Sequence, residues 1–251
     1  MRTPSGFALG PAAGVVVDWL LRMVRLDERF MLDRALLEDR FELPAFERTL
    51  DHLCAFLAGQ PPARRDAQRH LSLMAGEIAL DITALERPVD SIPQLMVDRA
   101  IGSLLEAFGR AREAIVQRVE EGCVIDAHGD LRPEHVWLGE PPAVIDCLEF
   151  SDELRIRDRA DEIAYLALEL ERIGHPHLGE LAIARYEERT GDRPGPRLFA
   201  FYRVFRAVQR ARLAVWHAAD PGRHPPEEWY GRARQYLELA LAHAPVALAS
   251  A

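Results

Sequence analysis

The chain has 251 residues, of which 49% are hydrophobic and 28% charged, so it can bury a core in one large domain or two small ones. Its formal net charge of −9 at pH 7 argues against binding to nucleic acid, which needs a cationic face. All 31 basic residues are arginines, which excludes any mechanism that requires a lysine from this chain.

Hydropathy and cysteine content indicate where in the cell the protein is expected. No apolar run approaches the ~20 residues of a membrane-spanning helix, and the start does not resemble a secretory signal, so we expect no membrane association. The cysteines Cys54, Cys123 and Cys147 are widely spaced and include no Cys-x-x-Cys pair. This spacing predicts neither a disulfide framework nor a zinc ribbon, and we expect a cytoplasmic protein.

The N-terminal segment predicts one strand behind a row of spaced glycines. Gly6, Gly10 and Gly14 lead into the β-branched run 15–21, which is typical of a strand. The rest of the chain is dominated by helical periodicity and helix-end signals. The predicted helices are 44–59, a segment ending near 84, 94–121, 157–172, 178–190, 198–219 and 227–244, and residues 245–251 are expected to fray.

Two short apolar runs interrupt the helical pattern near the middle of the chain. Residues 123–127 and 143–147 are rich in Val and Ile and too short for helices, so they predict two strands that flank a polar loop. We expect the strands to form a small hairpin that brings Asp130 and Asp146 to one end. Loops held by rigid elements commonly carry function, so this loop is the candidate site.

The loop, residues 128–135, reads HGDLRPEH, and the second strand ends at Asp146. Phosphoryl transfer from a nucleotide needs a carboxylate that orients the attacking hydroxyl, oxygen ligands for magnesium, and a cation that offsets the developing charge. Asp130 is a candidate for the first group, Asp146 for a metal ligand and Arg132 for the cation.

These residues carry a family resemblance. The loop resembles the protein-kinase catalytic loop, H-R-D-L-x-x-x-N, and is still more similar to the H-G-D-x-x-x-x-N loop of the aminoglycoside phosphotransferase family. The continuation IDCLEF at 145–150, followed by Arg155, Asp158 and DEIAYL at 161–166, resembles an uncharacterised bacterial branch of that family. The specific match covers about residues 124–170.

The resemblance implies an α+β, mostly α, protein-kinase-like fold with a helical large lobe and a vestigial or absent β small lobe. It implies ATP or GTP as phosphoryl donor, Mg²⁺, and a small-molecule hydroxyl as substrate. It gives Asp130 the role of catalytic base and Asp146, in the metal-binding segment 144–150, the role of magnesium ligand, and Arg132 stays the candidate catalytic cation. The further residues that it implies are His135 as second metal ligand, where the family has Asn, Met23 and Val24 beside the nucleotide, and His128 with Asp158 or Asp161 as supports of the loop.

The N-terminus leaves two interpretations open. In the first, residues 1–26 are a remnant strand and hinge, residues 27–251 are the large lobe, and a partner chain supplies the small lobe. In the second, the three glycines form a rudimentary phosphate loop, with Arg22 in place of the family's lysine. Because a kinase glycine-rich loop lies between two strands, the first is favoured.

Two other functions also remain open. A catalytically inactive, pseudokinase-like binding protein would account for a missing small lobe. Asp126, His128 and Asp130 also resemble the first metal-binding motifs of metallophosphoesterases, although the further ligands of that family have no counterpart in a fitting context. The intact pair Asp130 and Asp146 favours the phosphotransferase.

Overall fold

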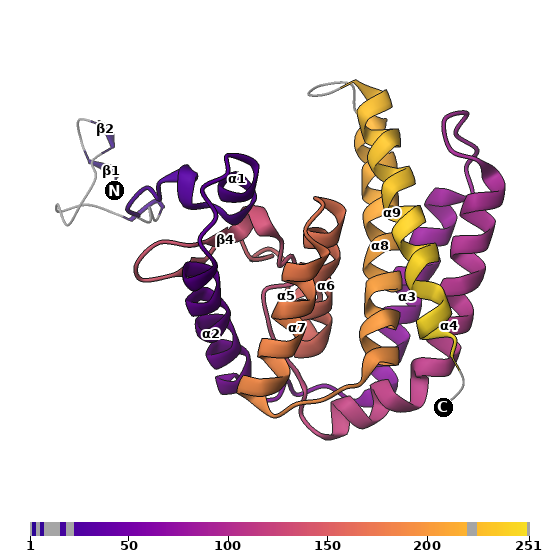
Figure 1. The fold of residues 1–251 in the computed structure, drawn as a ribbon, viewed down its shortest axis with the longest axis horizontal. Coiled ribbons are helices and arrows are strands. Elements are labelled where there is room, and N and C mark those ends of the chain that lie inside the picture. The colour runs from indigo at the N-terminus through magenta and orange to yellow at the C-terminus, as the bar shows by residue number, and fades with distance from the viewer. Residues whose placement is uncertain (1, 4–5, 8–15, 19–22, 220–224, 250–251) are drawn as a thin grey trace.

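The structure is a computed structural model that describes residues 2–3, 6–7, 16–18, 23–219 and 225–249. The described chain is mostly helical, with a few very short strands near its middle (Figure 1), which confirms the expectation of an α+β, mostly α, protein. The helices are α1 (Leu32–Leu37), α2 (Leu43–Gly59), α3 (Ala67–Leu85), α4 (Gln94–Glu120), α5 (Asp152–Arg155), α6 (Arg159–Arg172), α7 (Pro176–Thr190), α8 (Pro196–Ala218) and α9 (Pro226–Ala247), with 3-10 turns η1 (Glu28–Phe30) and η2 (Pro133–His135).

The predicted helices form because their apolar residues recur on one face. In α4, the buried side chains Leu104, Ala107, Ala111 and Ile115 follow a spacing of three or four residues. Capping sets where two helices begin. Asp66 accepts a hydrogen bond from the Arg69 backbone at the start of α3, and Asp158 accepts one from Ala160 at the start of α6. The cap at Asp158 explains why α6 begins two residues later than the predicted helix at 157.

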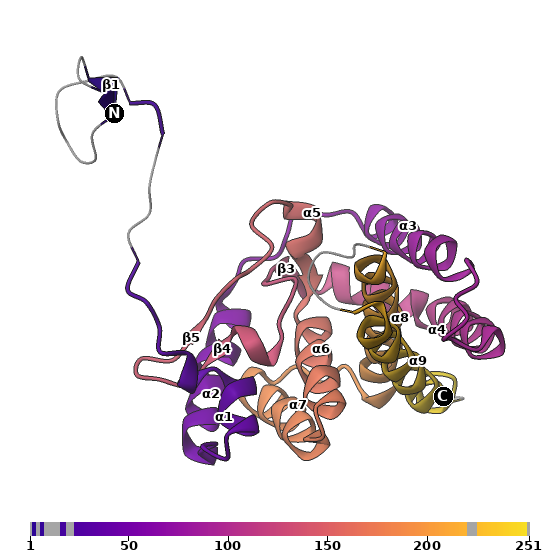
Figure 2. The same ribbon diagram turned by 90° about the horizontal axis from the view of Figure 1, so that it is seen from above.

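The helices form two groups that meet at α6 and α8. The first group holds α1, α2, α6 and α7, and the second holds α3, α4, α8 and α9 (Figures 1 and 2). Helix α8 packs along α9 and also contacts α3, α4 and α6. Its side chains are therefore buried around nearly the whole circumference of the helix.

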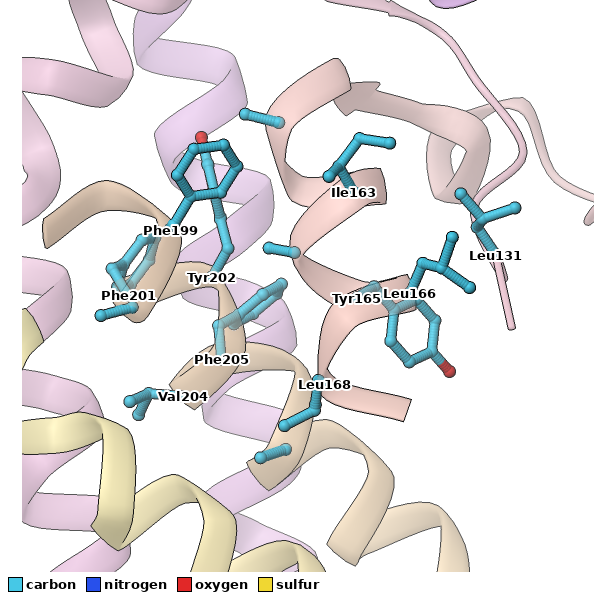
Figure 3. Close-up of a cluster of buried hydrophobic side chains, with 14 of the residues drawn as sticks. Leu131, Ile163, Tyr165, Leu166, Leu168, Phe199, Phe201, Tyr202, Val204 and Phe205 are labelled. Atoms are coloured by element: carbon cyan, nitrogen blue, oxygen red, sulfur yellow. The ribbon is translucent and has the colours of Figure 1, made fainter. Parts of the chain in front are cut away.

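The core between the two groups is aromatic and aliphatic. Figure 3 shows Phe199, Phe201 and Phe205 of α8 in the same cluster as α6, from which Ile163, Leu166 and Leu168 project. Leu131 of the polar loop lies beside Leu166 and is fully buried. One residue of the candidate site is thus anchored in the main core.

The strand pairing differs from the expected hairpin. Strand β3 (Val124–Asp126) pairs antiparallel with β6 (Ile156–Asp158), and β5 (Ala143–Val144) pairs with β4 (Val136–Trp137). Neither β4 nor β6 was expected, and the predicted pairing of 123–127 with 143–147 is wrong. The register places Ile125 opposite Arg157 and Val136 opposite Val144. The loop 128–135 therefore connects two separate two-stranded sheets.

Two terminal expectations also need correction. Residues 16–18, in the predicted strand, adopt no regular structure, whereas Val15 and residues 19–22 lie outside the described residues. Farther upstream, β1 (Arg2–Thr3) pairs with β2 (Gly6–Phe7). At the other end, α9 continues through Pro245 to Ala247 rather than fraying from 245, because Ala244 and Ala247 are buried against the core.

None of the described helices combines the length and hydrophobicity needed to cross a membrane. The three cysteines are free, as expected: Cys54 and Cys123 are buried and Cys147 is exposed. Burial raises the pKa of the Cys54 thiol to about 11.

A buried ion network ties the end of α4 to the start of α6. The Arg118 guanidinium donates to both carboxylate oxygens of Asp158 at 2.6 and 2.7 Å, and it also pairs with Asp192. The Tyr202 hydroxyl donates to Asp158 at 2.7 Å. These groups are nearly inaccessible to water, so each depends on its partners for solvation.

We expect Arg118→Met to destabilise the protein by about 3–5 kcal/mol, because it leaves the buried Asp158 carboxylate without its cation, whereas Asp192 keeps Arg159. Urea unfolding followed by circular dichroism measures this loss. The matched control is Arg69→Met, because Arg69 pairs with Glu153 on the surface, where an ion pair contributes about 0–1 kcal/mol. Equal losses for the two variants would contradict the assigned role of the buried network.

Candidate functional site

The polar loop is fixed at Gly129. This glycine has a φ of +82°, and a Cβ placed on it would lie 2.8 Å from the Leu154 carbonyl oxygen, so any side chain would be strained. Its N–H donates to the Glu162 carboxylate at 3.1 Å, and its carbonyl accepts from Arg206 Nη1 at 3.2 Å. Helices α6 and α8 thus hold the two peptide groups that flank Gly129.

The groups that hold Gly129 form a buried ionic cluster. Arg206 donates to both oxygens of Asp161, at 2.8 and 2.7 Å, and lies 3.5 Å from Glu162. Two carboxylates therefore share one guanidinium. Burial raises the pKa of Glu162 to about 7, Arg206 opposes this rise and the neighbouring Asp161 adds to it. Asp161 reaches the loop through Arg206, as expected of a loop support.

Asp130 lies in this fixed loop with both carboxylate oxygens in hydrogen bonds. The Tyr165 hydroxyl donates to Oδ1 at 2.9 Å and Arg132 Nε donates to Oδ2 at 3.0 Å. Burial alone would raise the pKa of Asp130, but Arg132 and Arg210, aided by the hydroxyl, lower it below its usual value. The carboxylate is therefore ionised and held in one orientation, and it retains lone pairs that can accept a proton.

His128 is a structural anchor, as the resemblance implied. Its Nδ1 lies 3.3 Å from the Asp130 backbone N–H and so accepts a hydrogen bond. Nε2 then carries the proton and donates to the Ile145 carbonyl at 2.7 Å. Burial lowers the pKa of His128, against the effect of the Ile145 carbonyl, so the ring is neutral. Both ring nitrogens are occupied by backbone partners.

His135 joins the two aspartates. Its Nδ1 lies 2.8 Å from the Asp130 carbonyl oxygen, which accepts and never donates, so Nδ1 carries a proton. Nε2 faces the opposite way, 3.4 Å from Asp146 Oδ2 and 3.3 Å from Arg132 Nη2. The expected hairpin does not form, and His135 instead lies between the backbone carbonyl of Asp130 and the carboxylate of Asp146.

Asp146 is placed by a strained backbone. It has a φ of +63°, in the left-handed region that non-glycine residues seldom adopt. The preceding residue, Ile145, is held on both sides, because its N–H donates to the His135 carbonyl and its carbonyl accepts from His128. The Asp146 side chain is 77% exposed and remains available to a ligand. Strain of this kind is common at functional sites.

Arg132 lies among the acidic groups of the loop. It donates to Asp130, forms a short ion pair with Glu134, and approaches His135. About four-fifths of its side chain is buried, which strengthens its field at Asp130. The predicted cation is therefore beside the predicted base.

Other expected residues lie elsewhere. Asp158 makes none of its described hydrogen bonds to the loop, because Arg118 and Tyr202 occupy it and it caps α6. Met23 and Val24 are strongly exposed, and their contact with a nucleotide stays a prediction. In the alternative glycine interpretation, Gly10, Gly14 and Arg22 lie outside the described residues.

Two of the residues that resemble metallophosphoesterase ligands, Asp126 and His128, already have partners within the protein. Asp126 pairs with Arg155 at 2.8 Å, and both ring nitrogens of His128 bind backbone groups. Within the described ranges, no group of three or more His, Cys, Asp or Glu side chains could hold a metal ion. Cavities of about 380 and 440 Å³ exist, but no residue of 128–135 lines either of them.

Sequence reasoning missed Tyr165, Glu162 and Arg206 as parts of the site. Their spacing in the sequence could have identified them. Residues 161, 162 and 165 lie on one face of α6, and arginines recur at helical spacing on one face of α8. Arg206 of α8 pairs with Asp161 and Glu162 of α6. Arg203 instead binds Glu180 of α7.

Comparisons with known proteins leave the function open. No protein-family model matches the chain, and no solved structure matches it. Among curated proteins, it is similar to the uncharacterized protein Mb2027c of Mycobacterium bovis and to the uncharacterized proteins MT2060 and Rv2004c of two Mycobacterium tuberculosis strains. Each is 38% identical over 151 residues, which is 59% of this chain. The matched part spans 30% of the length of these relatives.

The buried Glu162 carboxyl beside Arg206 predicts that the stability of the protein depends on pH. Folding raises the pKa of Glu162 from 4.5 to about 7, so the folded protein keeps a proton that the unfolded chain releases. Stability should therefore fall as the pH rises from about 4.5 to about 7, by up to about 2–3 kcal/mol from this group. Glu162→Gln, which can still accept from Gly129, should lack this slope. The measurement is urea unfolding across that pH range.

The control for this experiment is Glu149→Gln, at an exposed carboxylate in the same region. It should follow the wild-type pH profile. If the Glu162→Gln profile ran parallel to wild type instead, Glu162 would not be the group that titrates.

Proposed function

We propose that the chain is the large lobe of a kinase-like phosphotransferase that moves the γ-phosphoryl group of ATP or GTP to a hydroxyl of a small molecule. The observation that carries the proposal is the convergence on His135. Asp130 approaches one ring nitrogen through its carbonyl, at 2.8 Å, and Asp146 approaches the other at 3.4 Å. The Asp130 carboxylate itself lies 3.8 Å from the first of these nitrogens, Nδ1. Asp130 and Asp146 are the residues to which the loop resemblance assigns phosphoryl transfer.

The geometry of Asp130 suits a group that orients a hydroxyl. Its carboxylate is ionised, mostly buried and fixed by Tyr165 and Arg132. In the proposed reaction, the acceptor oxygen bonds to the γ-phosphorus while the bond to the β-phosphate oxygen breaks and nucleoside diphosphate leaves. The hydroxyl proton passes to Asp130, and Arg132 offsets the negative charge on the transferred group.

Of the two side chains that the resemblance implies as magnesium ligands, only one has a donor atom that suits magnesium. Asp146 offers the carboxylate oxygen that magnesium prefers. His135 offers an imidazole nitrogen, a donor better suited to transition metals than to magnesium. The roles given above to Asp130 and Arg132 are accordingly stated without a metal-dependent step.

The kinase-like fold belongs to the same proposal. A mostly helical body from residue 27 onward, with two short sheets around the loop, is compatible with a kinase large lobe. The described residues before 27 contain only the two-residue strands β1 and β2. In the same proposal, a small lobe from a partner chain completes the nucleotide site.

A catalytically inactive binding protein is the second candidate. Two observations favour it: Met23 and Val24 are exposed in a segment without strand structure, and the chain contains no lysine to pair with phosphates. In that case Asp130 and Asp146 would remain in place while nucleotide binding is lost.

We expect Asp130→Asn to lower phosphoryl transfer by about 10²–10⁴-fold, because the amide cannot accept the hydroxyl proton. The assay is ³¹P NMR of a nucleoside triphosphate with a panel of sugar and amino-alcohol acceptors, with Mg²⁺ and with Mn²⁺. Asp126→Asn is the matched control, since Asp126 is a nearby exposed aspartate that pairs with Arg155. Circular dichroism verifies that both variants fold. Unchanged turnover in Asp130→Asn would remove the base assignment.

Calorimetric titration with nucleotide separates the two candidates. Binding that requires a divalent ion and disappears in Asp146→Ala is expected for the phosphotransferase, because Asp146 is the exposed carboxylate beside His135. No binding at millimolar nucleotide would favour the inactive protein, and the search would then turn to a partner chain.

A further inference from the structure

We infer that Arg210 and Arg172 form a binding site, beside Asp130, for the phosphate group of an acceptor alcohol. The inference rests on the proposed function, because it names the class of alcohol that is phosphorylated there. The site lies at the outer end of a series of contacts between α6 and α8, where two guanidinium groups keep donors that no described residue uses.

One face of α6 leads from the polar loop to these arginines. Four residues recur on it at spacings of three or four: Glu162, Tyr165, Glu169 and Arg172. The Tyr165 hydroxyl donates to Asp130 at 2.9 Å. Glu169 and Arg172 therefore lie about one and two helical turns beyond the residue that holds the candidate base.

Helix α8 presents two arginines to this face, and the first of them is fully occupied. Arg206 donates to Asp161 from Nε and Nη2 and to the Gly129 carbonyl from Nη1. Its side chain is almost completely buried, so a ligand cannot reach it. Arg210 lies four residues later, about 6 Å farther along the same helix face.

Arg210 makes only weak contacts with the described residues. Its Nε lies 3.4 Å from the Tyr236 hydroxyl and 3.7 Å from the Glu169 carboxylate. In the part of the chain that the structure describes, neither Nη1 nor Nη2 makes a hydrogen bond. The side chain is 17% exposed, so an incoming group can reach the guanidinium.

Arg172 adds a second guanidinium of the same kind. Its Nε donates to Glu169 at 2.8 Å, and its two Nη groups make no hydrogen bond to any described residue. The Cζ atoms of Arg172 and Arg210 lie 5.4 and 5.7 Å from the centre of the Tyr236 ring. One carboxylate and one aromatic ring thus hold both guanidinium groups in position.

The carboxylates near Arg210 already have other partners. Glu169 is wholly buried and accepts from the Tyr236 hydroxyl at 2.6 Å as well as from Arg172. Burial raises the pKa of Tyr236 to about 12, so its hydroxyl stays protonated and continues to donate. Each oxygen of Asp130 also has its own donor. The free Nη groups of Arg210 are therefore available to an external anion.

The donor geometry indicates the ligand. Guanidinium groups bind phosphate through parallel N–H···O bonds, and two of them offer enough donors for its three terminal oxygens. Arg210 is also close enough to Asp130 to lower the pKa of that carboxyl. A phosphate bound at Arg210 therefore brings a hydroxyl of the same small molecule to Asp130.

The position of the arginines favours the acceptor over the nucleotide as the source of this phosphate. Arg210 and Arg172 belong to α8 and α6, whereas the candidate metal ligand Asp146 belongs to the segment after β5. The nucleotide phosphates are expected beside Asp146, where the metal would hold them.

The test measures binding of glycerol 3-phosphate and of glycerol to the purified chain, without nucleotide. The two probes differ only in the phosphate group, and NMR titrations give their affinities. Wild type should bind glycerol 3-phosphate at least about tenfold more tightly than glycerol. Arg210→Gln and Arg172→Gln should each weaken binding of glycerol 3-phosphate by about ten- to a hundredfold, because each removes charge-assisted hydrogen bonds.

The matched control is Arg203→Gln. Arg203 is a mostly buried arginine of the same helix that pairs with Glu180 and lines a separate cavity of about 380 Å³. It should leave binding of both probes unchanged. Circular dichroism verifies folding. If Arg210→Gln does not fold, Arg210→Lys replaces it, and this variant should weaken binding by about tenfold because it keeps the charge but loses the forked donors.

Three results would overturn the inference. The first is that glycerol 3-phosphate does not bind at millimolar concentration, or binds no better than glycerol. The second is that loss of binding follows Arg203 rather than Arg210 and Arg172. The third is that Arg210→Gln loses binding of ATP, which would assign these arginines to the nucleotide.

These outcomes are distinguishable from failure of the proposed function. A chain that binds glycerol 3-phosphate through Arg210 but transfers no phosphate supports this inference and contradicts the function. A chain that phosphorylates neutral alcohols as well as phosphorylated ones, with or without Arg210, does the opposite.

Discussion

The candidate site depends on one buried interaction, the Arg206 guanidinium between the Asp161 carboxylate and the Gly129 carbonyl. A charge in the core is stable only when its partners are in place, so this cluster holds α6, α8 and the loop in one arrangement. The neighbouring Glu162 binds the N–H of the same glycine. The orientation of Asp130 is therefore a product of the main core and does not rest on the loop alone.

The long helices and the loop could be predicted from the sequence, whereas the short helices α1 and α5 and the strand pairing could not. Helix α4 follows from its stripe of apolar residues, and α2 from Pro44 at its start and Gly59 at its end. Strands β4 and β5 have two residues each, too few for any period, and β6 is an extended segment directly before the cap of α6. Their partners are decided by long-range packing, which a local pattern does not encode.

Within the site, the sequence identified the residues of the loop and missed Glu162, Arg206 and Tyr165 among those that hold it. Asp130, Arg132 and His135 lie in one motif, and Asp146, from the following segment, lies beside His135. Tyr165 was visible only as one residue of a helix, because its contact with Asp130 spans 35 positions. The sequence left Asp158 and Asp161 as alternative supports of the loop. An aspartate at the start of a helix has the same local pattern whether it caps the helix or supports a loop, and Asp158 caps α6.

The single exposed cysteine has a practical consequence for chemical labelling. Cys147 directly follows Asp146, whereas Cys54 and Cys123 are buried and burial raises the pKa of both thiols. A maleimide added to the folded protein will therefore react first beside the candidate metal ligand. The natural chain thus offers an attachment point for a fluorophore or spin label that reports on this position, without any substitution.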